Sequence, residues 1–170
     1  MSAPVTAPAA AAWAVAASVP DPELPFLTVA DLGILRGVEP VDGAVVVTVT
    51  PTYSGCPAMA EIQRDIHRRL IQAGFERVEV RVALAPPWTT DWITDSGRRK
   101  LAAAGVAPPL AAPSPGAPVP VNLGPRRGPV PCPRCASPAT TQTSAFGATA
   151  CTSLYRCHGC GEPFEYVREI

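Results

Sequence analysis

Hydrophobic and polar residues follow a strand pattern in three segments of the first half of the chain. An apolar run at Ile34–Val38 and a second at Val45–Thr50 flank Asp42-Gly43, a strong signal for a hairpin turn. Residues 77–84 alternate strictly, and one face of this predicted strand carries the apolar side chains Val78, Val80, Val82 and Leu84. Arginine and glutamate fill the other face, so we expect a strand with one solvated side.

Helical spacing appears before, between and after these strands. The clearest helix is predicted after residue 57, where apolar residues recur on one face up to Ala73 and Gly74 provides a stop. A shorter helix is expected at Ala9–Ser18, a single turn at Thr28–Leu32, and another helix at Asp91–Ala104. The order helix, strand, strand, helix, strand, helix predicts an α+β domain with a small mixed sheet and packed helices.

Proline content divides the chain. The 22 prolines are too many for one core and cluster near the N-terminus and before residue 131. We therefore expect a disordered tail at 1–8, the α+β domain at 9–104, a Pro-rich linker at 105–130 and a small β module at 131–170.

Four of the six cysteines form two C-x-x-C pairs in the last module, Cys132/Cys135 and Cys157/Cys160, with 21 residues between them. Two such pairs on facing turns place four thiolates about 2.3 Å from a Zn2+ ion. A module this poor in large apolar residues needs the metal to fold, so we expect a structural zinc ribbon. Spacing alone does not select the metal, and a rubredoxin-like iron site is the alternative. His158 lies inside the second pair and could compete as a ligand.

Cys56 lies where the predicted strand meets the predicted helix, in the turn P-T-Y-S-G-C-P at 51–57. Pro57 suits the first helical position, because its missing N–H would have no intrahelical partner there. The Cys56 sulfur would then lie beside unpaired backbone N–H groups at the positive end of the helix dipole, a setting that lowers a thiol pKa. We therefore expect an activated thiolate that serves as nucleophile or metal ligand. The alternative is a small structural residue at a tight turn.

The sequence offers this thiol no evident base. His67 lies eleven residues along the same helix, about 16 Å away at 1.5 Å per residue. A cysteine hydrolase is therefore not expected, and we assign no catalytic residue. Asp21 and Glu23, in D-P-E-L-P at 21–25, could approach the turn or simply occupy a surface turn. Cys151 is either a small buried residue or a second thiol.

Charge and motif content argue against several functions. The chain has 14 basic and 14 acidic residues, a balance that does not favour nucleic-acid binding. It contains no E-x-x-H pair for a di-iron centre, no G-x-G-x-x-G, and no P-loop around its single lysine, Lys100. The apolar run Ala9–Val19 has no preceding Lys or Arg and is too short to span a bilayer. We therefore expect a cytoplasmic protein without a membrane segment.

Taken together, the motifs resemble a known family. D-P-E-L-P at 21–25, D-L-G-I-L at 31–35, P-T-Y-S-G-C-P at 51–57 and P-P-W-T-T-D-W at 86–92 resemble the MIP18 (DUF59) family of iron–sulfur assembly factors. With F-G-A-T-A-C at 146–151 and Y-R-C-H-G-C-G-E-P-F at 155–164, the chain resembles the PaaD family of phenylacetyl-CoA epoxidase systems. The match covers nearly everything except the N-terminal tail and the linker.

The resemblance implies a bacterial accessory protein in aerobic phenylacetate breakdown that helps to mature the iron or iron–sulfur centres of the epoxidase. The family's reactive cysteine corresponds to Cys56 and its acidic motif to Asp21 and Glu23; we add Thr52 and Trp88, from the matching motifs, as supporting residues. A single thiolate cannot hold a transient cluster, so a second protomer in a homodimer, Cys151 or a client protein must supply further ligands. The alternatives are a nucleic-acid-binding ribbon, a thiol enzyme and a non-catalytic scaffold within the oxygenase.

Overall fold

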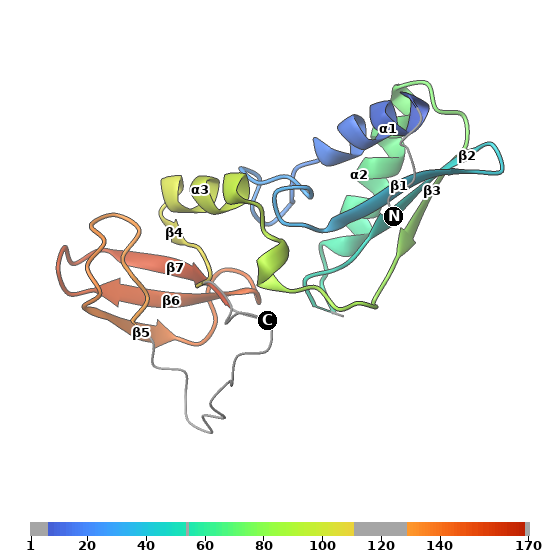
Figure 1. The fold of residues 1–170 in the computed structure, drawn as a ribbon. Coiled ribbons are helices and arrows are strands. Elements are labelled where there is room, and N and C mark those ends of the chain that lie inside the picture. Colours follow the sequence, from blue (N-terminus) through green and yellow to red (C-terminus); the bar gives the residue numbers. More distant parts are fainter. Residues whose placement is uncertain (1–6, 54, 111–128, 169–170) are drawn as a thin grey trace, which may run out of the picture. The chain divides into compact units, whose positions relative to one another are not determined.

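The computed structural model describes residues 7–53, 55–110 and 129–168. The predicted tail, residues 1–8, lies mostly outside this part of the chain, as do residues 111–128 of the predicted linker. The described chain forms two compact units, one up to Gly97 and one from Arg98 (Figure 1).

The first unit is built on a three-stranded sheet with the order β1-β2-β3. Its elements are α1 (Ala7–Ala17), β1 (Leu35–Val41), β2 (Ala44–Val49), α2 (Met59–Gln72), β3 (Val78–Val82) and a 3-10 turn η1 (Thr90–Trp92). β1 and β2 are antiparallel, whereas β2 and β3 are parallel. The predicted order of helices and strands is confirmed, and so is the α+β fold class.

The β1–β2 hairpin has the predicted turn. Asp42 and Gly43 both have positive φ, 49° and 76°. Positive φ at both central residues defines the type I′ turn, whose twist matches that of the flanking strands. The Asp-Gly pair therefore fixes the register of the hairpin, in which Val38 lies opposite Val47.

The core of the first unit lies between the sheet and the two helices. α1 packs on β1 and on α2, and α2 packs on β3. The apolar stripe of α2 is buried as its spacing predicts, through Met59, Ile62, Ile66 and Leu70. β2 contributes Val47 and Val49, both fully buried.

The apolar face predicted for β3 is only partly buried. Val78 and Val80 are half-buried, but Val82 is 41% exposed and Leu84 61% exposed. β3 lies at the edge of the sheet, and α2 is the helix that packs on it. The predicted solvated face, with Glu79 and Arg81, is exposed, and the apolar face is exposed as well at its C-terminal end.

The predicted helix Asp91–Ala104 is interrupted. The η1 turn ends at Ile93, which is extended, and the α-helix α3 (Asp95–Ala103) begins only afterwards. Thr94 explains the restart, because its Oγ1 accepts a hydrogen bond from the Gly97 N–H at 3.0 Å, the bond of an N-cap. The Thr94 N–H in turn donates to the Asp31 C=O at 2.9 Å.

The second unit contains a four-stranded sheet with the order β4-β7-β6-β5. The strands are β4 (Val106–Ala107), β5 (Thr140–Ser144), β6 (Thr152–Cys157) and β7 (Pro163–Val167). β4 lies inside the predicted linker, where it pairs in parallel with β7. The buried cluster of this unit is small and consists of Ala107, Val130, Cys132, Cys157, Phe164 and Tyr166.

Candidate functional site

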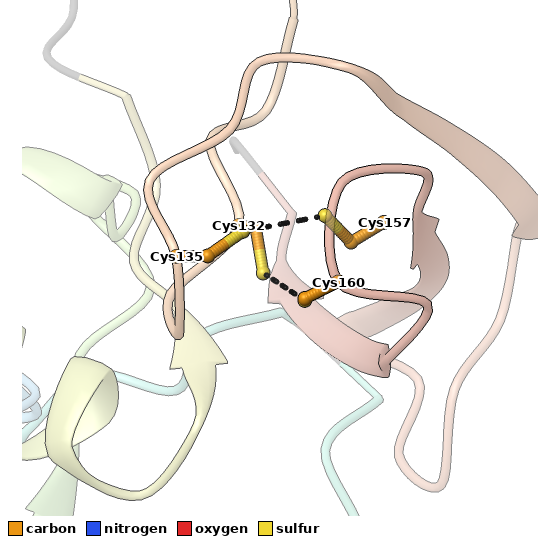
Figure 2. A group of neighbouring side chains, drawn as sticks. All are labelled: Cys132, Cys135, Cys157 and Cys160. Carbon is orange, nitrogen blue, oxygen red and sulfur yellow. Dashed lines mark hydrogen bonds between the residues drawn. The ribbon is translucent and has the colours of Figure 1, made fainter.

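The four cysteines of the C-x-x-C pairs form one cluster in the second unit. Their sulfur atoms all lie within 4.8 Å of one another, and Figure 2 shows the side chains converging from two loops. The Cys132 and Cys160 sulfurs are 3.8 Å apart, and the Cys135 and Cys157 sulfurs 3.5 Å. A tetrahedral site with metal–sulfur bonds of about 2.3 Å requires sulfurs about 3.8 Å apart. The cluster therefore fits a four-thiolate metal site.

The two cysteine loops have the same backbone geometry. The N–H groups of Ala136 and Gly161, each directly after the second cysteine of its pair, donate to the carbonyls of Cys132 and Cys157 at 2.8 and 3.0 Å. Both residues have positive φ, 58° and 80°. Ala136 bears a steric cost that Gly161 avoids. The repeat places both cysteine pairs on matching turns, as the spacing predicts.

Backbone N–H groups around Cys157 favour its thiolate. The pKa of Cys157 is lowered to about 6, first by the backbone hydrogen bond of Cys160 and further by that of Gly159, whose N–H lies 3.3 Å from the sulfur. Thiolates, not thiols, bind metal ions. His158 does not join the cluster, because its Nε2 lies 2.8 Å from Thr141 Oγ1.

Cys56 occupies the predicted turn, but α2 begins later than expected. The first helical residue is Met59, with Ala58 as the preceding cap residue, so Pro57 lies outside the helix. The Cys56 N–H donates to the Tyr53 C=O at 3.1 Å, which closes the turn. The thiol is half-buried.

The pKa of the Cys56 thiol is raised, not lowered as predicted. Burial is the largest cause, and the carboxylates of Glu23 and Asp21 act in the same direction. Hydrogen bonds from the Ala58 backbone and the Thr52 side chain oppose the increase. One N–H group at the helix start does reach the sulfur, but its effect is smaller than that of burial. Burial and the two carboxylates therefore favour the protonated form of the Cys56 thiol.

The acidic motif lies beside this thiol, as expected. Asp21 is buried, and its Oδ1 accepts hydrogen bonds from the N–H groups of Glu23 and Leu24 at 2.9 and 2.8 Å. Burial raises the pKa of Asp21 against these two bonds. Burial, and then the Asp21 charge, raise the pKa of Glu23 as well. The structure thus groups Cys56, Thr52 and two carboxylates with raised pKa values.

Two other candidates, Trp88 and Cys151, make local contacts of their own. Trp88 is buried, and its Nε1–H donates to the Leu32 C=O at 2.8 Å, which identifies a packing contact. Cys151 belongs to the second unit, where it is half-buried and its sulfur lies 3.0 Å from Thr149 Oγ1. The sequence did not single out Ala58, whose backbone hydrogen bond acts to lower the pKa of Cys56. A backbone donor leaves no signal in the identity of the side chain.

Known proteins match both units. A family model described as "PaaD zinc beta ribbon domain" matches residues 116–168, and one described as "Iron-sulfur cluster assembly protein" matches residues 9–82. None of the helices in the described part of the chain is both long and apolar enough to cross a bilayer.

Two relatives and one solved structure extend these matches. The chain is 44% identical to an Escherichia coli (strain K12) protein named as one of the subunits of a "Putative 1,2-phenylacetyl-CoA epoxidase", over 93% of this chain and 91% of the relative. It is 33% identical to "Fe-S protein maturation auxiliary factor" of Porphyromonas gingivalis, over 49% of this chain and 81% of that protein. A DUF59 domain of unknown function from Bacillus anthracis is 28% identical, with a TM-score of 0.52 over 56% of this chain and 92% of that one. This chain therefore belongs to the PaaD family, in which an iron–sulfur assembly domain of the DUF59 (MIP18) type is joined to a zinc β-ribbon.

Proposed function

We propose that this chain is an accessory factor that matures iron or iron–sulfur centres of a phenylacetyl-CoA epoxidase, and that Cys56 is the transient ligand for that cargo. The family model and the Porphyromonas gingivalis relative support an accessory role tied to iron–sulfur assembly. The epoxidase as client rests on the name of the Escherichia coli relative. The role of Cys56 rests on the geometry of its turn.

The observation that carries the proposal is the grouping of one thiol, Cys56, with two carboxylates of raised pKa, Asp21 and Glu23. Glu23 and Asp21 lie close enough to raise the Cys56 pKa. A soft sulfur next to hard oxygen atoms suits a ferrous ion or one iron of a cluster. Binding requires the thiol to lose its proton, so the incoming iron displaces the proton to solvent. The remaining ligands come from the client, a second protomer or Cys151.

The cysteine cluster of the second unit plays a different part. All its donors are sulfur, a set that favours zinc or iron over hard cations. We infer that Zn2+ fills this site, in accord with the ribbon family model. Four thiolates leave no open position for a substrate, so the ion is structural. The ribbon then holds a folded surface for client proteins, and its structural ion takes no part in cargo transfer.

Metal loading of the client tests the proposal. An epoxidase reductase is co-expressed with the wild-type chain, with Cys56→Ala or with Cys151→Ala, and purified anaerobically for iron and sulfide analysis. We expect less iron and less sulfide in the client with Cys56→Ala than with the wild type, provided that the circular dichroism of the variant matches the wild type. The Cys151→Ala result shows whether Cys151 supplies one of the remaining ligands. A fully metallated client in cells carrying this variant would show that Cys56 is not the cargo ligand.

A scaffold within the oxygenase is the second candidate function, because the Escherichia coli relative is named as an epoxidase subunit. A scaffold would co-purify stably with the catalytic subunits and would be indifferent to Cys56→Ala. Pull-down of the epoxidase subunits with both forms of the chain, in parallel with the iron analysis, separates the two functions.

A further inference from the structure

The outer edge of β3 presents outward-facing backbone groups in the first unit. The Arg77 C=O accepts from the Val45 N–H at 2.8 Å, and the Ala83 N–H donates to the Val49 C=O at 2.9 Å, so both residues face β2. Backbone groups alternate sides along a strand, so those of residues 78, 80 and 82 point away from β2. In the described part of the chain β3 has no second neighbouring strand.

An open groove lies between α2 and the middle of this edge strand, at Val80. One face of α2 supplies Ala60, Gln63, Arg64 and His67, and β3 supplies Val80. The volume of the groove is about 430 Å3. Pockets that bind small ligands usually have volumes of about 300–1,000 Å3. Gln63 Nε2 donates to the outward Val80 C=O at 3.4 Å, a long bond that an incoming backbone N–H can replace. A groove between an edge strand and a helix is the arrangement in which some domains bind an extended peptide by strand addition.

The lining of the groove determines what fits. None of its five residues is acidic, and its one arginine, Arg64, is 73% exposed and forms an ion pair with Glu61. A carboxylate of the bound segment therefore competes with Glu61 for the Arg64 guanidinium. Ala60 and Val80 supply the apolar surface, which Val82, 41% exposed, continues. We propose that this groove binds an extended, acidic segment of a partner protein, with the backbone of the segment paired to β3 and its carboxylates facing Arg64 and His67.

A second copy of this chain fits the edge poorly. Antiparallel pairing of two β3 strands would place both α2 helices on the same face of a continuous sheet. Because α2 packs on β3, the two helices would be separated by little more than the strand spacing of about 4.8 Å. Packed helices need about 8–10 Å between their axes. An isolated extended segment brings no helix and avoids this clash.

The same edge leads toward the Cys56 turn. β2 and β3 are parallel, so the C-terminal end of β3 lies at the end of the sheet where β2 enters that turn. A segment bound along β3 would therefore be directed toward the thiol. The docking inference goes beyond the proposed function and does not depend on it, because the groove includes no residue of the Cys56 turn.

Peptide binding to the full chain tests the groove. The probe is a short fluorescein-labelled peptide with threonine at every second position and valine and glutamate in turn at the positions between, so that all valines and glutamates lie on one face of the strand; binding is followed by fluorescence anisotropy. We expect Arg64→Glu to weaken its binding by about two- to fivefold, and Arg68→Glu to leave binding unchanged. The two arginines are a matched pair, since each is exposed on α2 and forms an i,i+3 ion pair, with Glu61 and Asp65 respectively. A lysine version of the peptide should prefer the Arg64→Glu chain.

Amide exchange locates the bound peptide. The peptide should slow exchange at Val78 and Val82, while the amides of Glu79 and Arg81, which face β2, change little. Equal loss of binding in both arginine variants, or protection elsewhere in the chain, would overturn the proposal. A concentration-dependent dimer that protects the β3 amides without peptide would also overturn it, in favour of a second copy. Cys56→Ala should bind the peptide normally, so failure of the proposed function and failure of the groove are distinguishable.

Discussion

Loss of one metal ligand, through Cys135→Ser, should unfold the second unit and leave the first unit folded. The buried cluster of the second unit contains six residues, and two of them, Cys132 and Cys157, are themselves ligands. Phe164 and Tyr166 are its only large aromatic members. Without the metal, the ligand cysteines lose the bonds that hold their two loops together.

The size of the effect follows from what such a core can supply. A hydrophobic core in a module of this size rarely provides more than about 3–5 kcal/mol. Structural zinc contributes about 10–16 kcal/mol in finger peptides. Loss of the metal therefore removes more free energy than the module has in reserve, and unfolding of the second unit should be complete. The first unit has its own core, built from α1, α2 and the sheet, and should be unaffected.

Hydrogen exchange with mass spectrometry on the full chain measures both units at once. We expect peptides from β6 and β7 to lose protection in Cys135→Ser, and in the wild type after chelation, while peptides from α2 keep theirs. Cys151→Ser is the matched control, since it changes a half-buried cysteine of the same unit outside the cluster. Full protection of β6 and β7 in protein shown by metal analysis to be free of metal would refute the reasoning.

Three further predictions concern the first unit. Glu23→Gln should lower the pKa of Cys56 by removing one of the charges that raise it. Alkylation of Cys56 by iodoacetamide should therefore begin at lower pH. Glu61→Gln, at the exposed glutamate of α2, should not shift this pH dependence. Gly97→Ala should destabilise by about 1–3 kcal/mol, because its Cβ would lie 2.6 Å from the Asp31 carbonyl oxygen; a thermal midpoint equal to that of the wild type would contradict this. Trp88→Phe should cost about 1–3 kcal/mol in urea unfolding, since a buried carbonyl loses its donor, and an unchanged midpoint would show that water replaces it.

Much of the fold could be predicted from local sequence signals. The Asp42-Gly43 pair determines the hairpin because few other residues accept positive φ at two successive positions. The apolar stripe of α2 determines which face it buries. The metal cluster was predictable for the same reason, since two identical C-x-x-C loops need only meet to bring four sulfurs together.

What the sequence did not reveal depends on contacts between distant segments. The exposure of Val82 follows from the place of β3 at the edge of the sheet, which alternation alone does not indicate. The helix restart after Ile93 depends on the Thr94 cap and on its contact with Asp31, more than sixty residues earlier. The raised pKa of Cys56 depends mainly on burial of the thiol by the surrounding residues. The feature visible in the sequence was the helix start, which predicted a lowered pKa.

The raised pKa changes the chemistry that suits Cys56. A thiol that stays protonated at neutral pH is a poor nucleophile and is slow to oxidise, because the thiolate is the reactive form. A thiol enzyme would instead need a lowered thiol pKa. In its proposed role as an iron ligand, the Cys56 thiol binds the metal only by losing its proton. Affinity should therefore rise with pH until the thiol pKa is reached, and the neighbouring carboxylates, which disfavour the bare thiolate, attract the cation that replaces the proton. Cys56 would thus remain inert until iron and a second ligand arrive together.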